Sequence, residues 1–472
     1  MRFPKLTLRR NSANIPMLLS KIAALSLVVI FSACTKEMKE VSAVPAQSYS
    51  NSIAAGKPNI ILINLDDIGF EVPRYNGGQS YLTPNMDFLA AHGIQFPQAR
   101  ALPLCSPSRT ELMTGKYNFR NYIGWAQLAL DERTIANDMR DAGYKTCLSG
   151  KWDLGGGHAS IVGHGFDTYM TSDPFTQFTD SADQTQHYKN PRLYTNGAFL
   201  PDSQTNGKYG DDMIRDFMFK FIDSNKSKPF FVYWATDLCH APFCPTPDDA
   251  DFAAWDPQQK ERVRDTIYFP SMVKYVDKLI GQLLSKLDAM SLSRNTIIIF
   301  TADNGTHPRI HSLWNNQIIQ GGKGKTLETG VRVPLIVYWK GHVAASTVGN
   351  LVDVCDVYPT ICDLAGIPYS SANRDGISFA PKILGTTGPK REWSFGYFDS
   401  RPGIDDKDPV QWVQNSTYKR YDSILNPKTK GFYNIKNDML EQKPFLYNKM
   451  SAGQRSTDSL FQAVLASMRA QQ

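Results

Sequence analysis

Runs of apolar residues recur along the chain, separated by segments with helical periodicity. Four of them, NIILIN, FFVYWA, TIIIFTA and VPLIVYW, are apolar at nearly every position, as in parallel strands buried on both faces. Amphipathic helices are predicted over 212–223 and 272–287, with apolar stripes made of Met213, Phe217 and Phe221, and of Met272, Val276, Ile280, Leu283 and Leu287. This alternation predicts an α/β fold: a large, mostly parallel sheet flanked by helices on both faces.

Shorter patterns divide the chain further. RLYTNGAFL reads as a hairpin over Asn196-Gly197, in a polar insertion that could line a pocket. From about residue 391 the short aromatic runs WSFGYF, QWVQ and GFYNI predict strands, and a helix follows whose apolar side holds Leu460, Phe461, Val464, Leu465 and Met468. We therefore expect one large domain over 57–390 and a smaller C-terminal α+β subdomain over 391–472.

The N-terminus reads as an export signal. Its first residues are basic and free of acids, and IAALSLVVIFSA is an apolar run of secretory length, too short to span a bilayer comfortably. FSAC resembles the lipobox of a bacterial lipoprotein, which implies cleavage before Cys34 and a lipid on its sulfur; a plain signal peptide is the alternative. This predicts a leader over 1–33, a flexible spacer over 34–56, and a lipoprotein in the periplasm or outer membrane of a Gram-negative bacterium.

Charge and cysteine spacing exclude several classes of function. The leader holds five basic residues, so its removal lowers the formal charge from +6 to +1, and no concentrated basic surface for nucleic acid is expected. The seven cysteines show no paired CxxC spacing, so a structural zinc site is not expected. Cys355 and Cys362 are too far apart on a helix to pair, whereas pairing of Cys239 with Cys244 stays open.

Two of the predicted strands end in adjacent polar residues. NIILIN is followed by Asp66 and Asp67, and TIIIFTA by Asp303 and Asn304. Strand ends are where open α/β sheets bind ligands, and adjacent carboxylates need a cation to offset their repulsion. A turn or helix cap explains either pair alone. Two such pairs together indicate an oxygen-ligand site for Ca²⁺ or Mg²⁺.

The stretch LCSPSRTELMTG predicts a short helix with a cysteine at its mouth. Ser106 suits the cap, Pro107 the first helical position, and Gly115 a left-handed C-terminal end. Cys105 then lies beside the helix N-terminus, where unpaired N–H groups favour a bound anion. Arg109 follows one turn later on the same face.

These residues carry a resemblance to the formylglycine-dependent (type I) sulfatases of the alkaline phosphatase superfamily. CSPSRTELMTG resembles the family signature, and NLDDIG, GYKTCLSGKW, HAP, TADNG and GGKGKTLETGVRVP follow in the family's order over about 57–340. A weaker match, YDSILNPKTKGFYNIKND, extends the resemblance almost to the end of the chain. The resemblance implies an alkaline phosphatase-like fold and hydrolysis of sulfate esters.

The resemblance also implies how the cysteine is used. A maturation enzyme converts it to formylglycine, an aldehyde that hydrates to a gem-diol. One hydroxyl attacks sulfur and expels the alcohol; the other then loses its proton and ejects sulfate as the aldehyde reforms. Carried over, Cys105 is that residue, and Asp66, Asp67, Asp303, Asn304 and the modified Cys105 hold Ca²⁺, with Mg²⁺ as the lesser alternative.

The remaining roles implied by the resemblance follow from charge. Arg109 holds the diol, Lys151 and Lys323 bind the sulfate oxygens, and His240 stands beside the leaving oxygen. One residue departs from the family: GKWDLGGGH has Asp153 where the family often has histidine. Either Asp153 contacts a substrate hydroxyl, or His158 or another group takes the missing role, or turnover is slower.

The sequence therefore predicts an exported sulfatase acting on a sulfate ester, most simply a sulfated carbohydrate. Two alternatives stay open: a phosphodiesterase or phosphonate monoester hydrolase of the same superfamily, and a non-catalytic glycan-binding relative. Turnover of aryl sulfate against aryl phosphodiester separates the first from a sulfatase.

Overall fold

The computed structural model describes residues 56–172, 174–175, 187–257, 266–371, 374–400, 408–424 and 431–472. All of these belong to one compact unit, 45–472. The predicted leader and nearly all of the predicted spacer, with Cys34, lie outside the described residues. Within the described part of the chain, no helix is both long and apolar enough to cross a bilayer.

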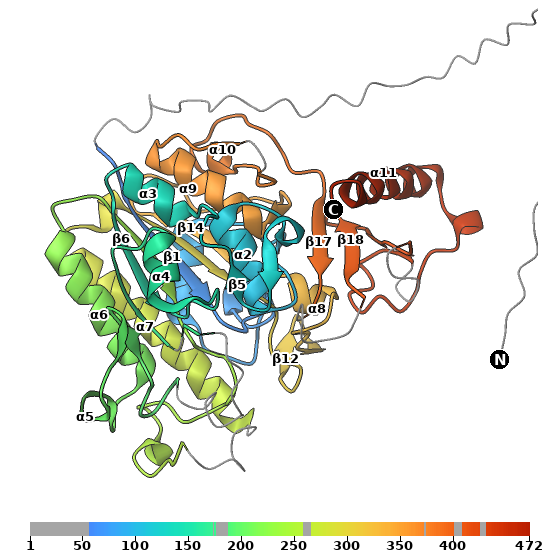
Figure 1. Ribbon diagram of the computed structural model, residues 1–472. Helices are drawn as coiled ribbons and strands as arrows, with labels where there is room; N and C mark the ends of the chain where they lie inside the picture. Colours follow the sequence, from blue (N-terminus) through green and yellow to red (C-terminus); the bar gives the residue numbers. More distant parts are fainter. Residues whose placement is uncertain are drawn as a thin grey trace, which may run out of the picture. The chain divides into compact units, whose positions relative to one another are not determined.

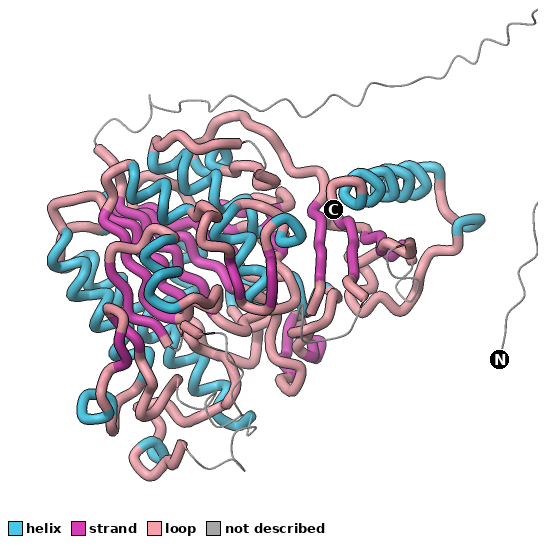
Figure 2. Tube along the Cα trace, in the orientation of Figure 1, coloured by secondary structure: helices cyan, strands magenta, loops and turns pink. Residues whose placement is uncertain are grey.

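A ten-stranded sheet forms the centre of the structure (Figures 1 and 2). Its strands, in spatial order, are β15 (Ser346–Thr347), β2 (Ile94–Gln95), β14 (Leu335–Trp339), β11 (Thr296–Ala302), β1 (Asn59–Leu65), β10 (Phe230–Ala235), β6 (Lys145–Gly150), β7 (Thr168–Thr171), β8 (Tyr194–Thr195) and β9 (Ala198–Phe199). The middle five, β11 to β7, run parallel. Every residue of β1, β10 and β11 is buried, which confirms the reading of their apolar runs.

Helices cover both faces of this sheet, as predicted (Figure 1). One group packs against β14, β6 and β10 and consists of α1 (Pro84–His92), α6 (Gly210–Asn225) and α7 (Phe269–Ala289). The opposite group consists of α2 (Cys105–Thr114), α3 (Ile135–Asp141), α9 (Val357–Ala365) and α10 (Ala380–Ile383). Shorter helices are α4 (Gly157–Gly163), α5 (Asp202–Thr205) and α8 (Glu328–Val331).

Two details of the predicted pattern differ in the structure. The run VPLIVYW forms β14, but β14 is antiparallel to β11, because a buried edge-side strand is equally apolar in either direction. In α6 the buried stripe is formed by Ile214, Met218, Phe221 and Ile222, whereas Met213 and Phe217 are only partly buried. The predicted stripe was therefore turned by about one residue, while that of α7 is buried as predicted.

The C-terminal strands form a separate four-stranded antiparallel sheet. It contains β17 (Ser394–Phe398), β18 (Val410–Gln414), β19 (Lys419–Tyr421) and β20 (Phe432–Tyr433), and α11 (Ala452–Arg469) packs on it. The sequence did not predict β19. Alternation along the strands sends Phe395, Val413 and Phe432 toward α11. On α11, Phe461, Val464, Leu465 and Met468 are buried, but Leu460 is exposed, contrary to the prediction.

The predicted hairpin forms two paired strands, β8 and β9, at the edge of the main sheet. Tyr194–Thr195 and Ala198–Phe199 pair across Asn196-Gly197, both of which have positive φ. Three small strand pairs lie outside the main sheet. The small pairs are β4 (Tyr122–Gly124) with β5 (Gln127–Leu128), β3 (Ala99–Arg100) with β16 (Val352–Asp353), and β12 (His311–Trp314) with β13 (Gln317–Gln320). The six described cysteines, Cys239 and Cys244 included, are free thiols.

Candidate active site

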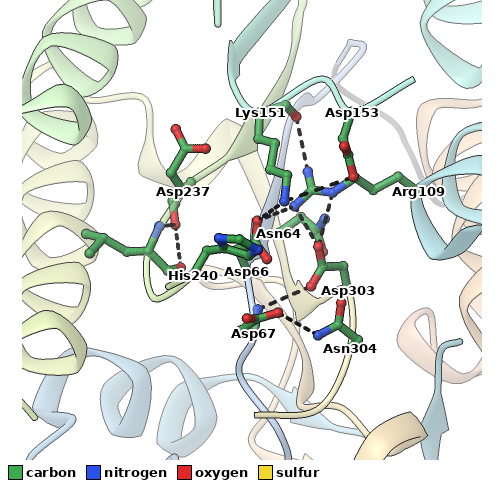
Figure 3. A network of polar contacts seen from close by, with 12 residues as sticks. Asn64, Asp66, Asp67, Arg109, Lys151, Asp153, Asp237, His240, Asp303 and Asn304 are labelled. Atoms are coloured by element: carbon green, nitrogen blue, oxygen red, sulfur yellow. Dashed lines mark hydrogen bonds and ion pairs between the residues drawn. The ribbon is translucent and has the colours of Figure 1, made fainter. Parts of the chain in front are cut away.

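The polar residues that follow β1 and β11 lie together at the carboxyl edge of the parallel sheet (Figure 3). The backbone N–H of Asp67 donates to Asp303 Oδ1 at 3.3 Å, and Asn304 Nδ2 donates to Asp67 Oδ1 at 2.8 Å. Asp67 has a φ of 57°, a left-handed conformation that turns the chain sharply as it leaves the strand. Adjacent parallel strands thus deliver three carboxylates and one amide to one place.

Cys105 is the first residue of α2 and is 5% exposed. Leu104, not Ser106, is the N-cap, so the predicted cap was wrong by two residues and Pro107 stands at the third helical position. The hydroxyl of Ser106 donates instead to Asp153 Oδ2 at 2.7 Å. Gly115 ends the helix with a φ of 65°, as predicted. Burial, then the charge of Asp153, raises the pKa of the Cys105 thiol well above its usual range.

Arg109 joins the helix to the strand-end carboxylates. Its guanidinium is fully buried and donates to Asp303 Oδ2 from Nη2 at 2.7 Å and from Nε at 3.1 Å, and Nη2 lies 3.4 Å from Asp66 Oδ2. Nη1 donates to the Lys151 carbonyl and to the Tyr233 hydroxyl. Because every nitrogen has a partner, Arg109 fixes the orientation of α2 relative to β1 and β11.

Two lysines from different segments reach the same carboxylates (Figure 3 shows Lys151). Lys151, directly after β6, donates to Asp66 Oδ2 at 2.5 Å. Lys323, in the loop between β13 and α8, lies 2.7 Å from Asp67 Oδ1 and 2.8 Å from Oδ2. Three cations therefore face three carboxylates in the described part of the site, and the buried charges offset one another.

Burial and these pairs set the ionisation of the carboxylates. Burial opposes the charge of Asp66, but Lys151, His240, Arg109 and Lys323 together hold its pKa well below its usual range. Burial and the neighbouring Asp66 raise the pKa of Asp303 to about 7, against the attraction of Arg109. The two carboxylates thus differ although both are buried.

His240 follows β10 on a loop that returns to the site. It offers one ring nitrogen that lies within 4.8 Å of carboxylate oxygens of Asp66 and Asp67. Its Nδ1 contacts the Ala241 carbonyl at 2.5 Å and therefore carries the proton. Burial, then the charges of Lys323 and Lys151, lowers the pKa of His240. The Tyr188 hydroxyl holds the loop through the carbonyls of Asp237 and His240.

The two candidate substrate-binding residues occupy different environments. Asp153 lies beside Lys151, at 4.0 Å between charged atoms, and its side chain is 18% exposed (Figure 3). His158 lies on α4, is exposed, and its Nδ1 contacts the Tyr169 hydroxyl at 2.9 Å. Among the described residues, His158 has no contact with the carboxylate cluster, whereas Asp153 is joined to it through Ser106 and Lys151.

Comparison with known proteins identifies the family. A family model described as Sulfatase matches residues 58–367, from the start of β1 to just beyond α9. The chain belongs to the sulfatase family. It is therefore a sulfuric ester hydrolase with the fold expected for that family, and the matched range contains the whole set of residues described above.

Named sulfatases cover most of this chain. Mouse N-acetylgalactosamine-6-sulfatase is 31% identical over 75% of this sulfatase and 71% of the relative. Human arylsulfatase A is 29% identical over 78% and 75%. Among solved structures, Ps i-CgsB in complex with k-i-k-neocarrahexaose has a TM-score of 0.69 and 26% identity, over 88% of this chain and 92% of that chain.

The oxygen atoms at the carboxyl edge suit a hard divalent cation. Asp66 Oδ1 and Asn304 Oδ1 are buried and have no hydrogen-bond partner in the described structure. Buried oxygens without a partner are costly, and oxygen is the ligand type that Ca²⁺ and Mg²⁺ prefer. Asp66 and Asp67 thus fit a metal site in this sulfatase, and His240, predicted only as a catalytic residue, lies close enough to contribute a nitrogen.

Several residues of the site were not predicted. The Tyr233 hydroxyl accepts hydrogen bonds from Arg109 and from Asn64, and this helps to hold the guanidinium group in place. Asp237 is buried and accepts from the Ser172 hydroxyl. Tyr233 lies within the apolar run of β10, so the sequence did not indicate a polar role for it. Asp237 follows the end of β10, a position from which a site residue could have been predicted.

Proposed function

We propose that this sulfatase is an exported enzyme that removes sulfate from sulfated carbohydrates, with Ca²⁺ and a formylglycine made from Cys105. The observation that carries the proposal is the convergence of Cys105, Arg109 and the strand-end carboxylates with two lysines in one buried site. The names of its relatives support the substrate class, since one is an N-acetylgalactosamine-6-sulfatase and another binds neocarrahexaose.

The protein's own residues have distinct tasks in this proposal. Lys151 and Lys323 neutralise sulfate oxygens, since each extends an ammonium group into the site. Arg109 holds residue 105 against the carboxylates, one helical turn away. His240 stands beside the leaving oxygen and acts on it as an imidazolium, in which Nε2 donates to that oxygen while Nδ1 keeps its bond to the Ala241 carbonyl.

Two groups supply chemistry that these side chains lack. Ca²⁺, held by Asp66, Asp67, Asp303, Asn304 and residue 105, supplies positive charge that acidifies a nearby hydroxyl. Formylglycine at position 105, made by a maturation enzyme, supplies an aldehyde hydrate as nucleophile and a route for sulfate release.

Mass spectrometry tests the modification most directly. In an active preparation from a host with the maturation machinery, the peptide containing residue 105 is expected to carry formylglycine. An active native preparation whose Cys105 is wholly unmodified would overturn this part of the proposal. Failure in a host without the machinery would instead show only that the machinery is required.

Substrate comparison tests the reaction. We expect release of sulfate from sulfated oligosaccharides and from an aryl sulfate, with much slower turnover of an aryl phosphodiester. Preference for the phosphodiester would favour the phosphodiesterase alternative. Absence of turnover on every ester, with Cys105 converted, would favour a non-catalytic glycan-binding protein.

Export and lipid attachment form a separate part of the proposal, supported by the basic start, the apolar run and FSAC. Cys34→Ser in the full-length chain is expected to move the protein from the membrane fraction to the soluble periplasmic fraction of a Gram-negative host. Equal distribution of both forms would favour a plain signal peptide.

A further inference from the structure

The loop that carries Lys323 is held at its far end by the small C-terminal sheet. Lys419 Nζ donates to the carbonyl of Thr326, and the Thr326 hydroxyl is 2.7 Å from the hydroxyl of Tyr421. Lys419 and Tyr421 are the first and last residues of β19. One short strand therefore binds both the backbone and the side chain of a single loop residue.

The anchoring groups on β19 are buried and fixed. Lys419 has no exposed side-chain surface, and its ammonium group also lies 3.0 Å from Glu441 Oε1. Burial, with the Glu441 charge adding to it, raises the pKa of Tyr421, so the hydroxyl stays protonated. A buried ion pair contributes little net stability but holds its members in one geometry.

Backbone hydrogen bonds fix the loop between Lys323 and Thr326. The N–H of Lys325 donates to the Gly322 carbonyl at 2.8 Å, and that of Lys323 donates to the Thr306 carbonyl at 3.0 Å. Gly324 donates to the Pro103 carbonyl at 2.8 Å, two residues before Cys105. Lys323 and Thr326 thus belong to one short segment whose backbone is hydrogen-bonded along its length.

The C-terminal sheet also packs against the segment that leads to Cys105. Trp412 and Tyr421 form an apolar cluster with Leu102 and Val331, and Leu104 packs against it. Leu104 is the N-cap of the helix that begins at Cys105. The sheet thus contacts the segments that present both Lys323 and Cys105.

We propose that β19 positions Lys323 for sulfate binding by holding Thr326, which makes Tyr421 and Lys419 positioning residues for the reaction. The inference rests on the role of Lys323 in the proposed function.

Removal of single hydroxyls tests it in the mature, converted enzyme. Tyr421→Phe keeps the ring in its cluster and removes the hydroxyl that contacts both Thr326 and Glu441. Thr326→Val removes only the Thr326 hydroxyl and leaves the contact between Tyr421 and Glu441 in place. Each is expected to lower kcat/KM for an aryl sulfate about five- to tenfold, the effect of losing one hydrogen bond. Tyr418→Phe is the matched control, because its hydroxyl makes no bond to the Lys323 loop within the described residues.

The deciding measurement repeats Tyr421→Phe in a Lys323→Ala background. If Tyr421 acts through Lys323, the second substitution has no further effect on kcat/KM. Equal falls in both backgrounds would overturn the inference, because Tyr421 would then act independently of Lys323. No fall from Tyr421→Phe and Thr326→Val would overturn it too, while leaving Lys323 in its role. An unchanged kcat/KM for Lys323→Ala would instead refute that role.

Discussion

Asp153 brings a negative charge into a site that binds an anion. Its carboxylate accepts from the Ser106 hydroxyl and lies 4.0 Å from Lys151, so its charge is partly offset. Its side chain is 18% exposed, and on the proposed function we expect it to contact a hydroxyl of the substrate.

We predict that Asp153→Asn lowers kcat/KM for a sulfated oligosaccharide at least tenfold, about 1.4 kcal/mol in the transition state. For an aryl sulfate without sugar hydroxyls we expect a change of less than about threefold. Steady-state kinetics on both substrates measures this. Asp153→His, which restores the common family residue, is expected to support aryl sulfate turnover at least as well as Asn.

The control for Asp153 is Ser106→Ala, which removes its hydrogen-bond donor and leaves the carboxylate in place. If Asp153→Asn and Ser106→Ala reduce turnover of both substrates equally, Asp153 orients the helix rather than the sugar. Wild-type kinetics for Asp153→Asn and Asp153→His on every sulfate would place Asp153 outside the site.

The carboxylates at the strand ends carry the second prediction at this scale. Asp66→Asn and Asp303→Asn each remove one charge from the buried cluster, so both are expected to abolish activity and metal binding while the fold is kept. Elemental analysis should find about one Ca²⁺ per chain in the wild type and none in the variants. Removal of the metal by a chelator should abolish activity reversibly.

Asp277→Asn provides a matched control for the metal prediction. Asp277 is also a buried aspartate, but it accepts from the backbone N–H groups of Asn85 and Met86 on α1. We expect this variant to retain calcium. A metal-free wild-type enzyme with full activity would contradict the assignment of the strand-end residues.

At the scale of elements, the C-terminal end of α2 packs closely against α9. Gly115 has a φ of 65°, and a Cβ added there would lie 3.0 Å from the Cβ of Tyr358. Gly366 ends α9 with the same φ of 65°, but an added Cβ would meet nothing within 4 Å. The two glycines separate the cost of conformation from the cost of crowding.

We predict that Gly366→Ala lowers the free energy of unfolding by about 1 kcal/mol, the cost of a left-handed alanine. Gly115→Ala should cost about 1–3 kcal/mol more, because Tyr358 must move in a packed core. Chemical denaturation of both variants measures the difference. Equal losses of unfolding free energy would show that Tyr358 can move away from the added methyl group at no measurable cost.

The elements that the sequence predicted well are those whose burial leaves a clear pattern of apolar residues. β1, β10 and β11 are apolar throughout because helices cover both of their faces, and α7 shows its stripe because only one side is buried. The direction of β14 was not predictable, because it depends on the path of the chain between β11 and β14, which the apolar pattern does not record. β19 was missed because its Lys-Arg-Tyr sequence is polar, and its lysine is buried through an ion pair.

At the scale of the whole molecule, the site depends on segments far apart in the chain. The motifs predicted that these charged residues share one site. The structure joins Arg109 to Asp303, Lys151 to Asp66, and Lys323 to Asp67. Spacing alone could not predict that Lys323 reaches Asp67 or that Ser106 binds Asp153, because these contacts depend on loop paths. The support of the Lys323 loop by β19 likewise arises only in three dimensions.

A buried ion pair connects the C-terminal region to the helices behind the site. Arg391, just before β17, forms an ion pair with Asp356, and its Nη1 donates to the Tyr117 hydroxyl at 2.8 Å. Both charged side chains are buried, at 3% and 1% exposure, so either one would be left without its counter-ion if the other were removed.

We predict that Arg391→Met and Asp356→Asn each lower the free energy of unfolding by about 3–5 kcal/mol, because each leaves a buried charge or a broken network. The double variant should lose clearly less than the sum of the two, since the second change removes a group that has already lost its partner. Arg133→Met is the control: Arg133 is 52% exposed and pairs with Asp138 and Asp141, so it should cost less than about 1 kcal/mol. Denaturant titrations of all four variants measure these values. Additive losses from Arg391 and Asp356 would mean that the two residues stabilise the molecule independently and that their ion pair does not couple the C-terminal sheet to α9.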